Sequence, residues 1–186
     1  MKIFSETKAL IELEKLKTDY QDFVKSNYER RAKSCQSCET KGACCLDAHF
    51  VNVHITRLEA AAIRRTLENL SETKQIEIYK RAAAAIEKYD LKSSGDTFGK
   101  TFACPLFQMG VGCLVHSNGK PAPCISHGCY ENEKDLPPEN LQEEIESQIE
   151  RLNKKTYGNA FNWLPLPAWL DSINPFARNS RAETRP

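Results

Sequence analysis

Eight cysteines are the residues of this 186-residue chain whose type and spacing could do chemistry. They form two groups of four, separated by a long interval without cysteine. The upstream group is Cys35, Cys38, Cys44 and Cys45, and the downstream group is Cys104, Cys113, Cys124 and Cys129. Thiolates are soft ligands, and four of them around one centre is the recurrent arrangement for zinc and for iron–sulfur clusters. We therefore interpret the eight cysteines as metal ligands.

Spacing in the upstream group fits this interpretation. A Cys-x-x-Cys pair such as Cys35 and Cys38 lets one short turn present two sulfurs to a single ion. The adjacent side chains of Cys44 and Cys45 tend to diverge, so they can serve different metals, or one can be a ligand and the other a buried thiol. Eight thiols suit two four-ligand sites, or one cluster with other cysteines left for redox chemistry or catalysis.

The sequence leaves the metal open between an iron–sulfur cluster and Zn²⁺. Structural zinc sites often use two Cys-x-x-Cys pairs, whereas this chain has one. Cys104 is followed by Pro105, like the Cys-Pro that ends ferredoxin-type cluster motifs. Both points slightly favour iron and sulfur. His116 and His127 lie near downstream cysteines in the sequence, and we expect them to hydrogen-bond to ligands rather than replace one.

Composition and charge limit the classes of function. The chain has 26 lysines and arginines against 25 aspartates and glutamates, so its net charge of +1 favours neither nucleic acid nor a membrane surface as a partner. It shows neither a signal-peptide pattern nor an apolar run long enough to span a bilayer, and we expect a cytoplasmic protein. In a reducing compartment, eight cysteines favour metal ligands or redox-active thiols over disulfides.

Helices are expected on both sides of the upstream group. Apolar residues three and four positions apart predict a helix over 5–31 with Ser5 as its N-cap. The capping box Thr56-Arg-Leu-Glu59 predicts a helix over about 57–70. Another helix restarts at Ser71, and the tight corner predicts an antiparallel helical hairpin that supplies most of the core.

Irregular backbone is expected around the downstream group. The Asn118-Gly119 pair is typical of a tight hairpin turn, which would bring Cys113 and Cys124 together. Pro121 and Pro123 lack amide donors, so the return limb is expected to be an edge strand or an extended loop.

The C-terminal part is expected to contain one more helix and a tail. The helix follows Pro137-Pro138 and stops at Gly158. Residues 1–160 would form a single metal-binding domain, of mainly α class, with an irregular cysteine-rich loop region and one short β-hairpin. The tail, 161–186, holds both tryptophans and has a polar end expected to be disordered. It could dock a protein partner, but we favour its folding back over the core.

The cysteine motifs also carry a resemblance. They are Cys35-x-x-Cys38, Gly42-Ala43-Cys44-Cys45, Cys104-Pro105-Leu106, Cys113-Leu114-Val115-His116, Lys120-Pro121 ahead of Cys124, and Cys129. Together they resemble the YkgJ-type cysteine-cluster family, described as zinc- or iron-chelating domains, over roughly residues 35–130. Five residues separate Cys38 from Cys44 where the family usually has two, and His116 and Lys120 stand in place of its usual tyrosine and arginine.

The resemblance implies metal binding through the cysteines, and three classes of function remain open. The first is a redox or maturation protein with an iron–sulfur cluster, and the second is a zinc-stabilised structural or protein-interaction module. The third is a protein lysine N-methylase-like enzyme, because the relatives include flagellin lysine-N-methylases. The sequence contains no Gly-x-Gly-x-x-Gly, P-loop or Gly-x-Ser-x-Gly motif, so no catalytic residue is assigned.

Overall fold

A computed structural model describes residues 4–33, 39, 42–46, 52–91, 96–158 and 163–177. Within these ranges the protein is mainly helical, with three two-stranded antiparallel sheets, which confirms the expected fold class. The α-helices are α1 (Glu6–Asn27), α2 (Arg57–Leu67), α3 (Glu72–Tyr89), α4 (Ala122–Ser126), α5 (Glu139–Tyr157) and α6 (Leu166–Ser172). The strands pair as β1 (Ala32–Lys33) with β5 (Cys129–Tyr130), β2 (His54–Ile55) with β6 (Leu164–Pro165), and β3 (Phe107–Gln108) with β4 (Gly112–Cys113). Short 3-10 helices are η1 (Glu29–Arg31), η2 (Ala43–Cys45) and η3 (Glu133–Asp135).

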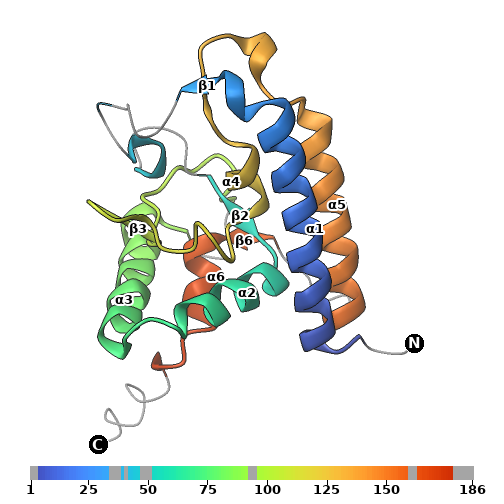
Figure 1. The fold of residues 1–186 in the computed structure, drawn as a ribbon. Helices are drawn as coiled ribbons and strands as arrows, with labels where there is room; N and C mark the ends of the chain where they lie inside the picture. Colours follow the sequence, from blue (N-terminus) through green and yellow to red (C-terminus); the bar gives the residue numbers. More distant parts are fainter. Residues whose placement is uncertain are drawn as a thin grey trace, which may run out of the picture.

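Helices α1 and α5 lie side by side along one edge of the molecule (Figure 1). The Ser5 hydroxyl accepts a hydrogen bond from the Lys8 amide at 3.4 Å, which confirms the predicted N-cap, and α1 ends four residues before the predicted position 31. We call the core beneath this pair the α1–α5 core; its buried residues are Ala9, Leu13, Tyr20, Val24, Leu58, Ala122, Ile125, Ile145 and Ile149. Phe23, which the spacing places on the apolar face, is instead 45% exposed.

A second core lies between α2, α3 and α6. We call it the α3–α6 core; its buried residues are Ile55, Ala60, Ile63, Leu67, Ile78, Tyr79, Ala82, Leu91, Phe102, Leu106, Val115, Leu166 and Leu170. Leu166 and Leu170 are at most 1% exposed. The described part of the C-terminal segment, 163–177, therefore folds back over the core, as favoured from the sequence.

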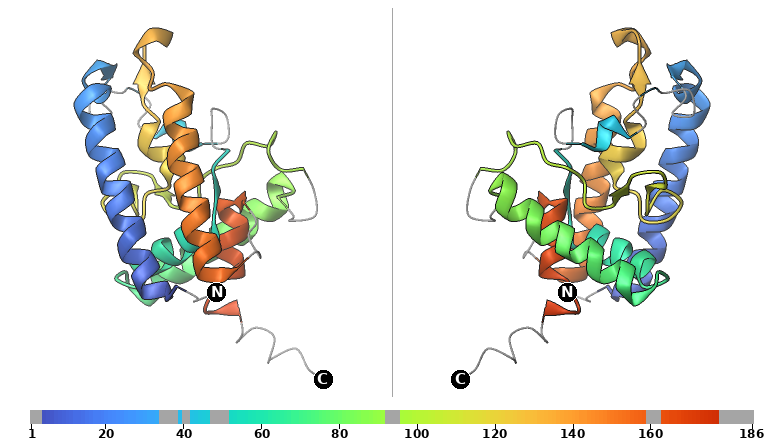
Figure 2. Two further views of the ribbon diagram at one scale, coloured as in Figure 1. Left: turned by 90° about the vertical axis from the view of Figure 1, so that its right-hand side faces the viewer. Right: turned by 90° about the vertical axis from the view of Figure 1, so that its left-hand side faces the viewer.

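Helices α2 and α3 depart from the expected antiparallel hairpin. Both form, with the predicted Thr56–Glu59 capping box at the start of α2. However, α3 packs principally against α6 and touches α2 only slightly, and Figure 2 shows α6 beside α3. The reason is the β2–β6 pairing, which sets Ile55 opposite Leu164 and so delivers α6 to the apolar face of α3.

A buried ion pair joins the helices on the two sides of the molecule. The Lys17 ammonium of α1 lies 3.3 Å from a Glu59 carboxylate oxygen of α2, and the two side chains are 9% and 0% exposed. The same oxygen accepts a hydrogen bond from the Ala122 amide at the start of α4, and the other oxygen accepts one from the Thr56 amide. Glu59 thus fixes α1, α2 and α4 relative to one another.

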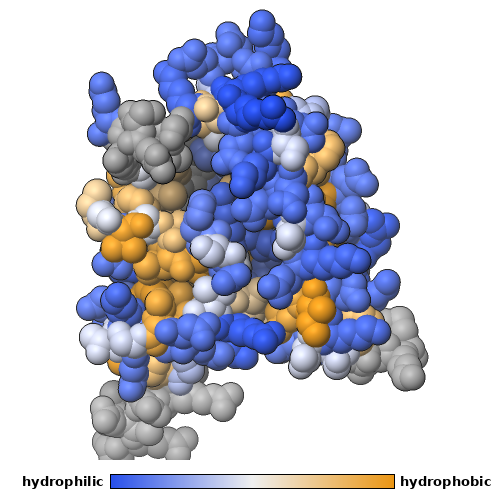
Figure 3. Space-filling view, in the orientation of Figure 1, coloured by the Kyte–Doolittle hydropathy of each residue, from blue (hydrophilic) through white to orange (hydrophobic). Residues whose placement is uncertain are grey.

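The surface differs between the two sides of the molecule. Figure 3 shows hydrophilic residues over most of the α1 side and hydrophobic residues gathered on the side of α3 and β3. Met109 and Val111, at the tip of the β3–β4 hairpin, are 72% and 66% exposed. Among the described residues, no helix combines the length and apolar character needed to cross a bilayer.

Removing the lysine of the buried pair tests its structural role. We expect Lys17→Met to lower the free energy of unfolding by about 3 kcal/mol, because it leaves the buried Glu59 carboxylate without a countercharge. Urea denaturation followed by circular dichroism measures the change. The matched control is Lys15→Met, an exposed lysine of the same helix. Equal stability of the two variants would show that the pair does not organise the fold.

Candidate metal centre

The segment from Cys104 to Cys113 forms a short hairpin at the edge of the α3–α6 core. Strands β3 and β4 pair with Phe107 opposite Cys113, and the Cys104 carbonyl accepts a hydrogen bond from the Phe107 amide at 3.1 Å. Both cysteines pack against the α3–α6 core. A β-hairpin was expected between Cys113 and Cys124, but the hairpin in the structure ends at Cys113.

Cys124 lies on a helix, which corrects the prediction of an edge strand or extended loop. Pro121 is the N-cap of α4 and Pro123 lies in its first turn, where no intrahelical amide donor is needed, so the prolines start a helix instead of preventing one. Gly119 has a φ of +87°, as the predicted turn requires. Ala122 and Ile125 bury α4 in the α1–α5 core, which places Cys124 between the two cores.

Cys44 and Cys45 lie on η2, against the downstream hairpin. Gly42 precedes them with a φ of +83°, and a Cβ atom there would overlap the Phe107 ring. This close approach favours glycine, which has no Cβ and adopts positive φ readily. The Cys45 carbonyl accepts a hydrogen bond from the Cys104 amide at 2.9 Å. This backbone contact brings Cys44 and Cys45 of the upstream group beside Cys104 of the downstream group.

Cys35 and Cys38 lie outside the described residues, but the segments that flank them are fixed. On one side, β1 ends at Lys33, which is paired with Cys129 of β5. On the other side, η2 is bonded to Cys104. Cys129 itself is exposed. The chain that carries Cys35 and Cys38 thus begins and ends beside downstream cysteines.

Five cysteines have thiols that each lie within electrostatic reach of at least one of the others. Burial first, and then the Cys104 and Cys44 thiols, raise the pKa of Cys45 to about 12. Burial, followed by the charge of Cys124, raises the pKa of Cys104 to about 12. The pKa of Cys113 is also raised, by burial first, and Cys44 contributes.

Cys124 completes this group of five, which we call the thiol cluster: Cys44, Cys45, Cys104, Cys113 and Cys124. Burial raises the pKa of Cys124 to about 12, and Cys113 and Cys45 add to the shift. Lys120 and, more weakly, Lys17 act in the opposite direction. Thiols that are desolvated and close together resist becoming thiolates unless a cation joins them, and a soft metal cation supplies that charge.

The donor chemistry of the thiol cluster fits zinc or iron. The five thiols of the cluster are free, so no disulfide among them consumes a candidate ligand. Within the described ranges, no three histidine, cysteine, aspartate or glutamate side chains are already grouped as a metal site. The structure brings five of the eight predicted ligands together, places Cys129 at the β1–β5 sheet, and does not describe Cys35 or Cys38.

The predicted roles of the histidines are not equally supported. The His116 amide donates to the Cys113 carbonyl at 3.2 Å, whereas the His116 side chain lies on the surface. The pKa of His127 is lowered by desolvation first and by Lys120 second. Hydrogen bonding from either ring to a ligand stays a prediction. His54 is buried, with its Nε2 atom 2.9 Å from the Thr97 hydroxyl, and His49 lies outside the described residues.

Sequence reasoning missed three residues that shape this region. Lys17 and Glu59 position α4, yet Lys17 reads as one more surface charge of α1 and Glu59 only as part of a capping box. The signal that could have drawn notice to Lys17 is its spacing, because it lies four residues after Leu13 and three before Tyr20 on the buried face. Gly42 belongs to a motif named from the sequence, but the close approach of Phe107, 65 residues away in the sequence, has no local signal.

Comparison with known proteins gives no family for the chain. No family model matches it. No curated protein and no solved structure is significantly similar to it. The resemblance of the cysteine motifs therefore stays a prediction, and the geometry of the thiol cluster carries the functional argument.

Alkylation rates should separate the exposed cysteine from the cluster. In reduced, metal-free protein at pH 8, we expect iodoacetamide to modify Cys129 at least about tenfold faster than Cys104 and Cys124, because the thiolate is the nucleophile and both cluster thiols are desolvated with raised pKa values. Peptide mass spectrometry over time measures the rates, and urea-unfolded protein is the control in which the difference should vanish. Similar rates in the native protein would contradict the described environment.

Proposed function

We propose that this protein binds a metal through its cysteines, as an iron–sulfur cluster or as zinc. The observation that carries the proposal is the convergence of Cys44, Cys45, Cys104, Cys113 and Cys124. Each of these thiols affects, or is affected by, at least one other, although they come from three separate segments, η2, the β3–β4 hairpin and α4. Cys35 and Cys38 would add ligands from the chain between β1 and η2, and Cys129 would add one from β5. A bound centre would supply positive charge to thiolates that are otherwise costly to form.

The position of the thiol cluster favours a stabilising contribution from the metal. Cys104 and Cys113 pack on the α3–α6 core, whereas Cys124 is carried by α4, which is buried in the α1–α5 core. A centre that joined these cysteines would tie the two cores together. This observation supports the second candidate, a zinc-stabilised structural or interaction module, as well as a cluster protein whose cofactor also serves redox or maturation work.

Elemental analysis and the visible spectrum distinguish the metals. We expect protein purified without oxygen to contain either iron with sulfide-to-iron charge-transfer absorbance and a brown colour, or stoichiometric zinc without colour. The first result supports an iron–sulfur protein, and the second supports the zinc module. Protein that holds neither metal, even after reconstitution with ferrous iron and sulfide or with zinc, would refute the proposal.

A pair of variants on α4 tests whether the thiol cluster holds the metal. Cys124→Ser should lower the metal content per chain by more than half and lower the thermal midpoint, because a hydroxyl is a poor substitute for a thiolate ligand. The control is Ser126→Ala, two residues after Cys124 on the same helix. It removes a side-chain hydrogen bond to Gln142 of α5 and should keep the metal. Equal metal content in the two variants would exclude Cys124 as a ligand.

A further inference from the structure

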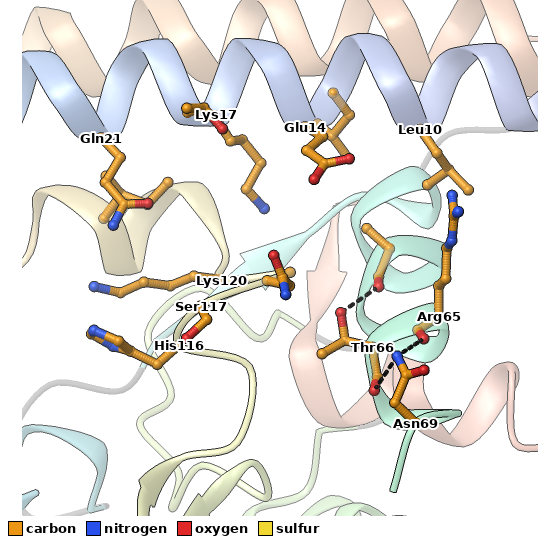
Figure 4. A pocket seen from close by; sticks show the side chains of 16 residues that line it. Leu10, Glu14, Lys17, Gln21, Arg65, Thr66, Asn69, His116, Ser117 and Lys120 are labelled. Carbon is orange, nitrogen blue, oxygen red and sulfur yellow. Dashed lines mark hydrogen bonds between the residues drawn. The ribbon is translucent and has the colours of Figure 1, made fainter.

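A cavity of about 270 Å³ lies beside the thiol cluster, between α1, α2 and the loop of residues 116–120 (Figure 4). We call it the α1–α2 pocket. Figure 4 shows Lys17 and Gln21 pointing into it from α1, and Lys120 and His116 extending across it from the loop. Its volume suits a small molecule of roughly ten to fifteen heavy atoms rather than a polymer.

The lining of the pocket is rich in cationic donors. Four basic residues contribute, namely Lys17, Arg65, His116 and Lys120, against the single carboxylate of Glu14. Lys17 is already matched by Glu59 at 3.3 Å, so it offers N–H donors rather than net charge. Within the described residues, neither Arg65 nor Lys120 forms an ion pair. Arg65 and Lys120 carry two positive charges and Glu14 carries one negative charge. The lining therefore keeps one net positive charge without any contribution from His116.

The loop that carries Lys120 is held firmly against α2. Gly119 approaches α2 so closely that a Cβ atom would lie 3.0 Å from the Thr66 hydroxyl and 3.4 Å from the Ile63 Cα. On the other side, Pro121 and Ala122 enter α4, where the Ala122 amide donates to Glu59 at 3.2 Å. Lys120 is therefore anchored on both sides, which lowers the entropic cost of using it to bind a ligand.

We propose that the α1–α2 pocket binds a small molecule that carries an oxyanion, either a phosphate or a carboxylate group, with Lys120 as the charged partner of the oxyanion. Arg65, whose guanidinium lies at the other end of the pocket in Figure 4, adds positive charge to the lining. Lys17 and Gln21 supply further N–H donors from α1. Charge-assisted hydrogen bonds from these groups suit an oxyanion, which accepts several donors at once. This site is separate from the metal ligands, and its argument does not depend on a metal.

Lys120 connects the pocket to the thiol cluster. Its charge lowers the pKa of both Cys113 and Cys124, which places the ammonium within electrostatic reach of those thiols. An oxyanion on Lys120 would lie on the thiol side of the pocket. A ligand in the pocket would thus lie next to the metal that the cysteines are proposed to bind.

Titration followed by two-dimensional amide NMR tests the proposal with two probes, inorganic phosphate and succinate, at constant ionic strength. We expect one of them to give saturable shifts of the amides at 117–120 and at Arg65. Saturation by phosphate alone assigns a phosphate-bearing ligand, and tighter binding of succinate assigns a carboxylate. No saturable shift with either probe would overturn the proposal.

Variants identify the pocket as the place of binding. Lys120→Met should weaken binding by about tenfold, the effect of losing one charge-assisted hydrogen bond. Arg65→Met should weaken it less, because its guanidinium lies at the other end of the pocket, while Glu14→Gln should strengthen it. Lys15→Met, on α1 but outside the pocket, should leave the affinity unchanged. Arg65 is not among the charges that shift the thiol pKa values, so its effect also excludes binding of the probe at a metal. Unchanged affinity in both weakening variants, with native-like spectra, would refute the site.

Discussion

The buried Glu59 carboxylate is the group on which the rest of the architecture depends. It has no exposure to solvent, so its charge must be compensated inside the protein. Lys17 of α1 provides the countercharge, and the amides of Thr56 and Ala122 provide hydrogen bonds. These partners belong to α1, the start of α2 and the start of α4. Satisfying one desolvated charge therefore sets the relative positions of three helices.

The thiol cluster is a consequence of this arrangement. Because Ala122 is fixed on Glu59, α4 holds Cys124 at the boundary between the two cores, where the β3–β4 hairpin brings Cys104 and Cys113 from the other side. The η2 turn joins them through the bond between the Cys45 carbonyl and the Cys104 amide. No one segment contains this cluster. It exists only when both cores have formed, so binding of the proposed metal would be coupled to folding.

Local signals predicted the parts of the fold that local physics determines. The Ser5 cap, the Thr56–Glu59 capping box and the positive φ of Gly119 follow from neighbouring residues, and the structure has all three. The errors came from contacts between distant segments. The β2–β6 pairing brings α6 onto α3 in place of α2. The burial of Ala122 and Ile125 in the α1–α5 core favours a helix started by Pro121 over a strand. The eight candidate ligands could be predicted from residue type and spacing. The convergence of five of them in the thiol cluster depends on contacts between distant segments, so it could not.

Lys17 and Lys120 give the thiol cluster and the α1–α2 pocket a shared electrostatic environment. Both lysines line the pocket, and both lower the pKa of Cys124 against the larger effect of burial. An anion bound in the pocket would offset the charge of Lys120 and so reduce its stabilisation of nearby thiolates, whereas a metal cation on the cysteines would attract the anion. Each would therefore raise the affinity for the other only if the attraction between metal and anion exceeded the loss of thiolate stabilisation by Lys120. A thiolate centre with surplus negative charge would instead oppose the anion, so the net charge of the centre determines the sign of the coupling.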